Sequence, residues 1–264
     1  MLFRTLTFFL VCVGCLATAA PAVGQDRAAV LASRDHPLPV ATDFNLITAV
    51  DVSASITPQE EVLQYDGLAR GVVDAQFLAR IAEGAERRIG FAAFTWSSGG
   101  QVAVVVPWTV IATRADAERV AAQFNAAPRL DRSTFGRYGP ATAGAANPGG
   151  GMTDIGEAVE SAVALSLAAP FPTRRSVLNI LSNGVDNDGP SPDAVRDHAI
   201  RLGMTINGIV FGPRADLPGY FRDHVIGGPG AFLMTVSEPA DLPRALEKKF
   251  WQDLIAALAE PSAG

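Results

Sequence analysis

The sequence has little cysteine, little histidine and no excess of positive charge, and each shortage excludes a class of protein. Its two cysteines, Cys12 and Cys15, both lie near the N-terminus, which excludes a fold cross-linked by disulfides. Lysine and arginine number 21 against 27 aspartates and glutamates, a formal charge of -6, which argues against binding to nucleic acid or to an anionic membrane surface. The histidines, His36, His198 and His224, lack the spacing of zinc ligands.

Motifs of the common nucleotide-binding and hydrolytic enzymes are missing as well. The sequence has no G-x-G-x-x-G after its first predicted strand, no G-x-S-x-G nucleophile turn and no phosphate-binding loop ending in Gly-Lys-Ser or Gly-Lys-Thr. With 48% hydrophobic and 18% charged residues, the 264-residue chain has enough apolar material for one sizeable core. We expect a globular domain, and no residue is a candidate for catalysis.

The first 24 residues have the profile of a secretory signal peptide. Arg4 is the only charged residue before Asp26, an apolar run follows it, and small residues precede an expected cleavage site before Gln25. We therefore predict an exported protein, periplasmic or secreted, whose mature chain has no membrane span. An uncleaved N-terminal anchor and a lipidated Cys15 are the alternatives.

The remaining chain is predicted to form an N-terminal arm or linker and one domain. Residues 25–42 contain two prolines and no sustained hydrophobic period, as is typical of an arm. Residues 43–260 are predicted to form the domain. Within it, residues 129–151 are rich in glycine, alanine, proline and arginine, which predicts a mobile insert.

Strand and helix patterns alternate through the domain. The apolar run at residues 44–50 is typical of a buried parallel strand. Thr57, Pro58 and Glu60 form the capping-box pattern that begins a helix. Further strands are expected at residues 88–96, 101–108, 176–181, 204–211 and 231–236, and further helices at 115–126, 155–167, 192–202 and 242–258. This order predicts an α/β fold with a doubly wound, mostly parallel sheet, one antiparallel edge strand and helices on both faces.

Three local details can be tested against a structure. The apolar face of the helix that begins at Thr57 includes Val62 and continues to Ile81. Ser191 is expected to cap the helix at residues 192–202. The residues 186–189, Asp-Asn-Asp-Gly, are interpreted as a turn between a strand and that helix.

Side chains with oxygen atoms follow the first predicted strand. Asp51, Ser53 and Ser55 alternate along an extended segment, which places them on the same side of the chain. The carboxyl ends of parallel strands are where α/β sheets bind ligands. Carboxylate and hydroxyl oxygens without histidine or cysteine suit magnesium, manganese or calcium rather than zinc.

This D-x-S-x-S pattern resembles the metal-ion-dependent adhesion site of von Willebrand factor type A domains. Thr153, in a loop that opens a helix, is similar to the threonine of the family's second motif. Asn183 stands where the family usually has an acidic residue, which is the one departure from the pattern. The stretch Gly-Gly-Pro-Gly-Ala-Phe at residues 227–232 also resembles a group of exported bacterial type A domain proteins of uncharacterised function.

The resemblance implies a Rossmann-like fold and a metal site with defined roles. The hydroxyls of Ser53, Ser55 and Thr153 would bind the ion directly, and Asp51 and Asn183 would hold its waters. An Asp or Glu carboxylate of a protein partner would complete the shell. The hypothesis is an exported, adhesion-type protein-binding module that depends on Mg²⁺, with Mn²⁺ or Ca²⁺ as alternatives. A metal-free interaction scaffold and a magnesium-dependent hydrolase are the competing hypotheses.

Overall fold

The computed structural model describes residues 39–129, 151–189 and 191–258, except the side chains of residue 251 and of residues 255–258. The predicted signal peptide, most of the predicted arm and the interior of the predicted insert lie outside the described residues. In the part of the chain that is described, no helix is both long and apolar enough to cross a membrane.

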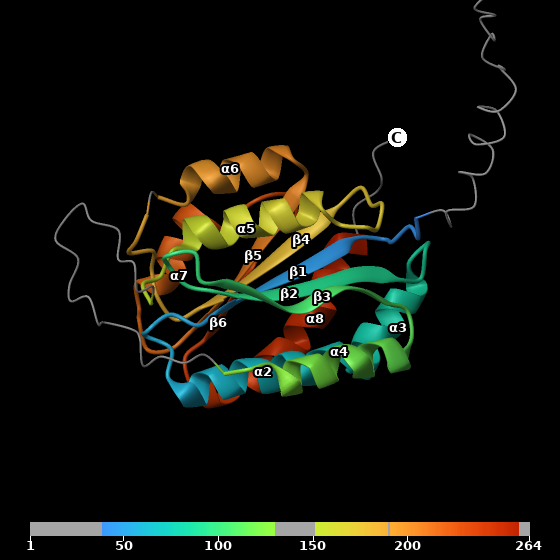
Figure 1. The fold of residues 1–264 in the computed structure, drawn as a ribbon, viewed down its shortest axis with the longest axis horizontal. Helices are drawn as coiled ribbons and strands as arrows, with labels where there is room; N and C mark the ends of the chain where they lie inside the picture. Colours follow the sequence, from blue (N-terminus) through green and yellow to red (C-terminus); the bar gives the residue numbers. More distant parts are fainter. Residues whose placement is uncertain (1–38, 130–150, 190, 259–264) are drawn as a thin grey trace, which may run out of the picture. The chain divides into compact units, whose positions relative to one another are not determined.

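The centre of the described unit is a six-stranded sheet with the order β3-β2-β1-β4-β5-β6 (Figure 1). Neighbouring strands are parallel except β2 and β3, which form an antiparallel pair at one edge. The sequence-based prediction of a mostly parallel sheet with one antiparallel edge strand is therefore confirmed. The strands are β1 (Asn45–Asp51), β2 (Ile89–Trp96), β3 (Val102–Ile111), β4 (Ser176–Ser182), β5 (Met204–Phe211) and β6 (Leu233–Val236).

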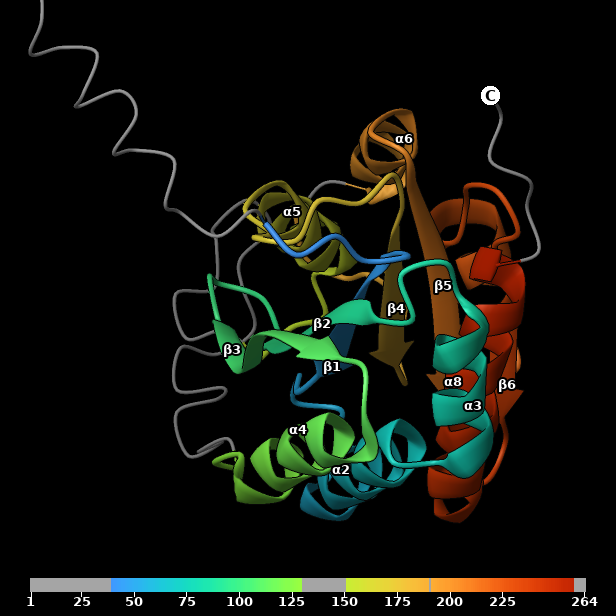
Figure 2. The same ribbon diagram turned by 90° about the vertical axis from the view of Figure 1, so that its right-hand side faces the viewer.

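Helices cover both faces of the sheet, as the two views show (Figures 1 and 2). One face packs against α2, α3, α4 and α8, and the other packs against α5, α6 and α7. The helices are α2 (Pro58–Val72), α3 (Ala75–Glu83), α4 (Arg114–Ala126), α5 (Ile155–Leu167), α6 (Asp193–Arg201), α7 (Leu217–Tyr220) and α8 (Leu242–Leu258).

The four inner strands are mostly apolar because helices cover both faces of the sheet. Every residue of β1, β2, β4 and β5 is buried. Alternate side chains enter two separate cores, so that Val50 packs under α2 and α8 while its neighbour Ala49 packs under α5. The core thereby fixes the positions at which β1 and β4 end.

The first predicted helix is wrong in its extent. Asp74 interrupts the helical segment: its carboxylate accepts hydrogen bonds from the backbone N–H groups of Gln76 and Phe77 and begins a new helix, α3. The apolar period of the sequence continues across this break because α2 and α3 pack against the same core. Val62 is also a wrong assignment, since its side chain is 47% exposed.

The start of α6 and the segment after β5 also differ from the expectations. The residue before α6 is Pro192, which has no side-chain capping bond, and the hydroxyl of Ser191 instead bonds the Asp193 carboxylate.

Between β5 and β6 the chain forms α7 and a π-helical turn, Phe221–Val225, which were not predicted from the sequence. Phe221 and Val225 are fully buried there and complete the core under α6.

The strand order creates a switch point beside β1. From β1 the chain crosses to β2 on one side, whereas β4, β5 and β6 follow on the other side. The loops after β1 and β4 therefore leave adjacent strands in opposite directions. In sheets of this kind, the crevice between such loops is the usual place for a ligand.

Candidate metal centre

Asp51 is the last residue of β1, and its carboxylate is fully buried. One carboxylate oxygen accepts a hydrogen bond from the backbone N–H of Ser53 (2.8 Å), and the other accepts one from the hydroxyl of Ser182 (2.6 Å). Burial raises the pKa of Asp51, while the bonds from Ser182 and Ser53 act in the opposite direction. The amide of Gln64 on α2 donates to the backbone oxygen of Asp51 (2.9 Å) and fixes the end of the strand.

Four further oxygen atoms form a connected cluster at this edge of the sheet. The hydroxyl oxygens of Thr153 and Ser53 lie 3.4 Å apart, and those of Ser53 and Ser55 lie 3.1 Å apart. The Ser55 hydroxyl donates to the side-chain oxygen of Asn183 at 2.6 Å. The structure therefore brings all five sequence-predicted site residues together, although Thr153 is separated from Ser53 by 100 residues. That these residues bind a metal stays a prediction.

The position of Thr153 is set by the loop after β4. Asn187 holds it through two bonds: its side-chain oxygen accepts from the Thr153 N–H (2.8 Å), and its own N–H donates to the Thr153 carbonyl (2.9 Å). Two residues earlier, the Gly151 carbonyl accepts from the N–H of Ala54 (2.7 Å). The loops after β1 and β4 are thus both bonded to the segment that carries Thr153.

Asp186 was interpreted as part of a turn, and the structure gives it a different role. Its carboxylate accepts a hydrogen bond from the N–H of Ile155, the first residue of α5, at 2.6 Å. Burial, together with the charge of Asp154 nearby, raises the pKa of Asp186 to about 6 although the Ile155 bond lowers it. Asp186 therefore supports the start of the helix behind Thr153.

Several residues that hold the site were missed by sequence analysis. Ser182 and Gln64 bond Asp51, and Asn187 bonds Thr153, as described above. Ser98, between two of the predicted strands, is fully buried and exchanges two hydrogen bonds with Met152 beside Thr153. One sequence feature could have identified two of these residues: Ser182 and Gln64 are polar residues at a mostly apolar strand end and on a mostly apolar helix face.

The donor set fits a hard divalent cation. Its atoms are hydroxyl, amide and carboxylate oxygens, which magnesium, manganese and calcium prefer. No group of three or more histidine, cysteine, aspartate or glutamate side chains that could hold a metal exists among the residues described. Gly184 leaves the cluster open, since a Cβ atom there would lie 3.3 Å from the Thr153 hydroxyl oxygen. A cation in this place would therefore rely on hydroxyl groups, with Asp51 as the one carboxylate.

Comparison with known sequences places the chain in a family. Residues 41–258 match the family described as "Protein of unknown function (DUF1194)". The chain belongs to this family. Among curated proteins, none matches its sequence.

Solved structures resemble this DUF1194 protein at low sequence identity. Proximal thread matrix protein 1 (PTMP1) from the mussel byssus matches with a TM-score of 0.58 and 16% identity over 82% of this chain. Another structure of PTMP1, described as having a zinc occupied MIDAS motif, matches with a TM-score of 0.57 and 16% identity over 82% of this chain and 48% of that chain. The pilus adhesin SpaC from Lactobacillus rhamnosus GG matches with a TM-score of 0.54 and 10% identity over 83% of this chain.

The DUF1194 chain spans only part of these proteins. It covers 49% of the PTMP1 chain and 31% of the SpaC chain. A von Willebrand factor type A structure from Catenulispora acidiphila also matches, with a TM-score of 0.49 and 15% identity over 84% of this chain and 44% of that chain. The likeness to PTMP1 and SpaC shows that the DUF1194 chain shares their fold, and its mostly parallel sheet with helices on both faces fits the von Willebrand factor A or Rossmann-like fold.

Proposed function

We propose that this DUF1194 protein is an exported, divalent-cation-dependent module that binds other proteins. The observation that carries the proposal is the oxygen cluster at the switch point. Hydroxyl oxygens of Ser53, Ser55 and Thr153 and the amide oxygen of Asn183 are linked by distances of 2.6 to 3.4 Å, next to the buried Asp51 carboxylate. Oxygen donors of this kind suit magnesium, manganese or calcium.

Each residue has a distinct part in the proposed site. Ser53, Ser55 and Thr153 hold a Mg²⁺ ion through their hydroxyl oxygens, while Asp51 and Asn183 orient its water ligands. A bound cation supplies an electrophilic centre for a ligand oxygen. Because Asp51 is the single carboxylate among the five residues, the site keeps enough positive charge to attract an Asp or Glu side chain of a partner protein.

The named neighbours support this proposal in general terms. One PTMP1 structure has a metal-occupied adhesion-site motif, and SpaC is a pilus adhesin. Both are interaction or matrix proteins rather than enzymes by description. Export, to the periplasm or out of the cell, is inferred from the predicted signal peptide at residues 1–24.

Titration calorimetry of the chelator-treated protein with Mg²⁺ and then Mn²⁺ tests the proposal. We expect binding heat for the unchanged protein and at least a tenfold loss of affinity in Ser53→Ala, because a direct ligand is removed. The matched control is Ser191→Ala, which removes an exposed hydroxyl before α6 that bonds Asp193 and is not part of the oxygen cluster. Equal affinity in Ser53→Ala and the control would contradict the assignment of the ligands.

Thermal unfolding gives an independent readout. A ligand that binds the folded state at a hundred times its Kd raises the free energy of unfolding by about 2.7 kcal/mol. We expect Mg²⁺ to raise the melting temperature of the unchanged protein and of Ser191→Ala, but not of Ser53→Ala. Absence of both heat and a melting shift at millimolar Mg²⁺ would favour the metal-free scaffold.

A further inference from the structure

Among the described residues, no strand pairs with the outer edge of β6. On its inner side, the carbonyls of Phe232 and Val236 accept hydrogen bonds from Gly208 (3.1 Å) and Gly212 (3.0 Å) of the β5 segment. Since the N–H and C=O of one strand residue point to the same side, those of Leu233 and Thr235 point outward. In the described part of the chain, no hydrogen bond to these outward groups is found. Such an edge is a template for strand addition.

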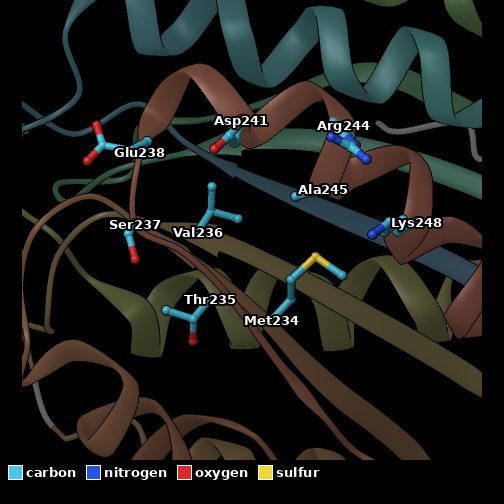
Figure 3. A pocket seen from close by; sticks show the side chains of 9 residues that line it. All are labelled: Met234, Thr235, Val236, Ser237, Glu238, Asp241, Arg244, Ala245 and Lys248. Carbon is cyan, nitrogen blue, oxygen red and sulfur yellow. The ribbon is translucent and has the colours of Figure 1, made fainter.

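A groove of about 550 Å³ runs along this edge (Figure 3). Five consecutive residues of β6 and the segment after it line one side of the groove. The opposite wall is one face of the first turns of α8 and the residue before it. The lining includes Thr235 of β6, Glu238 after it, and Asp241, Arg244 and Lys248 on the α8 side.

The charges of the groove are separated along its length. Glu238 and Asp241 lie at one end, and Arg244 and Lys248 lie at the other, as the close view shows (Figure 3). All four side chains are exposed, and none of them forms an ion pair with another described residue. Asp241 and Lys248 are seven residues apart, which is about 10 Å along a helix axis at 1.5 Å per residue.

A two-fold axis perpendicular to the sheet at β6 would reverse this charge pattern. The acidic end of one groove would then face the basic end of the other, with Asp241 near the second copy's Lys248 and the reverse pair related by symmetry. The two β6 edges would run antiparallel, so the outward groups of Leu233 and Thr235 could pair with those of the second copy. An unrelated acidic peptide would match only the Arg244 and Lys248 end of the groove.

We propose that two copies of this chain associate through the outer edge of β6 and the charged face of α8, forming one sheet that continues across the interface. The interface is isologous, because the same surface is used on both copies. Antiparallel pairing makes the carboxyl ends of the two sheets point in opposite directions. If the proposed metal function also holds, the dimer presents its two sites at opposite ends and links two partners.

Charge reversal tests the proposed pairing. The protein is purified in the form that its host produces. Its molar mass is then measured by analytical ultracentrifugation across about a hundredfold range of concentration, because dimerisation follows mass action. We expect a dimer for the unchanged chain. Asp241→Lys and Lys248→Asp each replace two attractive contacts by two repulsive ones, and each alone should raise the dimer Kd at least tenfold.

Mixing the two variants distinguishes this interface from any other. A chain with Asp241→Lys and a chain with Lys248→Asp have complementary charges at both contacts. A one-to-one mixture should therefore form a heterodimer, although each variant alone stays monomeric. The chain that carries both substitutions should dimerise like the unchanged chain. A mixture that stays monomeric while the unchanged chain dimerises would overturn the charge pairing.

A backbone variant tests the strand pairing separately. Thr235→Pro removes an N–H that points away from β5, so the β5–β6 bonds remain and circular dichroism should show an unchanged fold. We expect this variant to be monomeric. A dimer that persists in Thr235→Pro would overturn pairing through β6, and an unchanged chain that is monomeric at every concentration would overturn the proposal as a whole.

Discussion

Asn183 is the position at which one substitution should change metal affinity and stability in opposite directions. Its side-chain oxygen accepts from the Ser55 hydroxyl (2.6 Å), and its side-chain nitrogen donates to the Ser55 carbonyl (3.1 Å). Asn183→Asp keeps the first bond and replaces the second by a contact between two oxygens. Without metal, we expect the free energy of unfolding to fall by about 0.5–1.5 kcal/mol, the usual net contribution of such a bond.

With metal, the same substitution should strengthen binding. A carboxylate about 5 Å from a divalent ion contributes about 1.7 kcal/mol at the dielectric constant of water, which is more than a tenfold decrease in Kd. Calorimetric titration with Mg²⁺ measures the affinity, and urea unfolding in the presence of a chelator measures the stability.

The control for this prediction is Asn125→Asp. Asn125 is exposed near the end of α4, so its substitution changes the net charge by the same amount without touching the cluster. We expect Asn125→Asp to leave the Mg²⁺ affinity within about twofold, because exposed charges at a distance are screened. If Asn183→Asp binds Mg²⁺ no more tightly than this control, the placement of Asn183 beside a cation is refuted.

Three more outcomes follow from the contacts of the site. Ser182→Ala removes the bond to the buried carboxylate of Asp51 and should lower the free energy of unfolding by about 1.5–3 kcal/mol in urea; a loss below about 0.5 kcal/mol would contradict this. The pKa of Asp186 is about 6 in the folded state and lower when unfolded, so without metal the melting temperature should fall as pH rises from about 4 to about 7, and Asp186→Asn should flatten this fall. Gly184→Ala places a Cβ atom 3.3 Å from the Thr153 hydroxyl and should weaken Mg²⁺ binding in calorimetry at little cost in stability.

The parts of the fold that local sequence patterns specify were predicted correctly. The Thr57 capping box begins α2, with both of its reciprocal hydrogen bonds formed. The mostly apolar runs form the buried inner strands, because helices cover both faces of the sheet. Asp51, Ser53 and Ser55 do come together, but not along the extended segment that was predicted: residues 53–56 form a turn, in which the Ile56 N–H donates to the Ser53 carbonyl (3.0 Å).

Features that depend on contacts between distant segments could not be predicted in this way. Ser182 and Asp51 are 131 residues apart, so no local sequence pattern predicts the hydrogen bond between their side chains. Asn187 resembled a turn residue, because the threonine that it holds lies on another loop. The break at Asp74 was hidden for a related reason: α2 and α3 pack against one core, so their apolar residues share one continuous pattern.

The position of the cation is the central claim, and anomalous diffraction from crystals grown with Mn²⁺ tests it most directly. Mn²⁺ replaces Mg²⁺ at sites with oxygen ligands. Its anomalous signal gives its position independently of the electron density of the protein. The account predicts a single strong peak roughly 2.1–2.2 Å from the hydroxyl oxygens of Ser53, Ser55 and Thr153. Crystals in which these three hydroxyls still bond one another, with no Mn²⁺ among them, would contradict it.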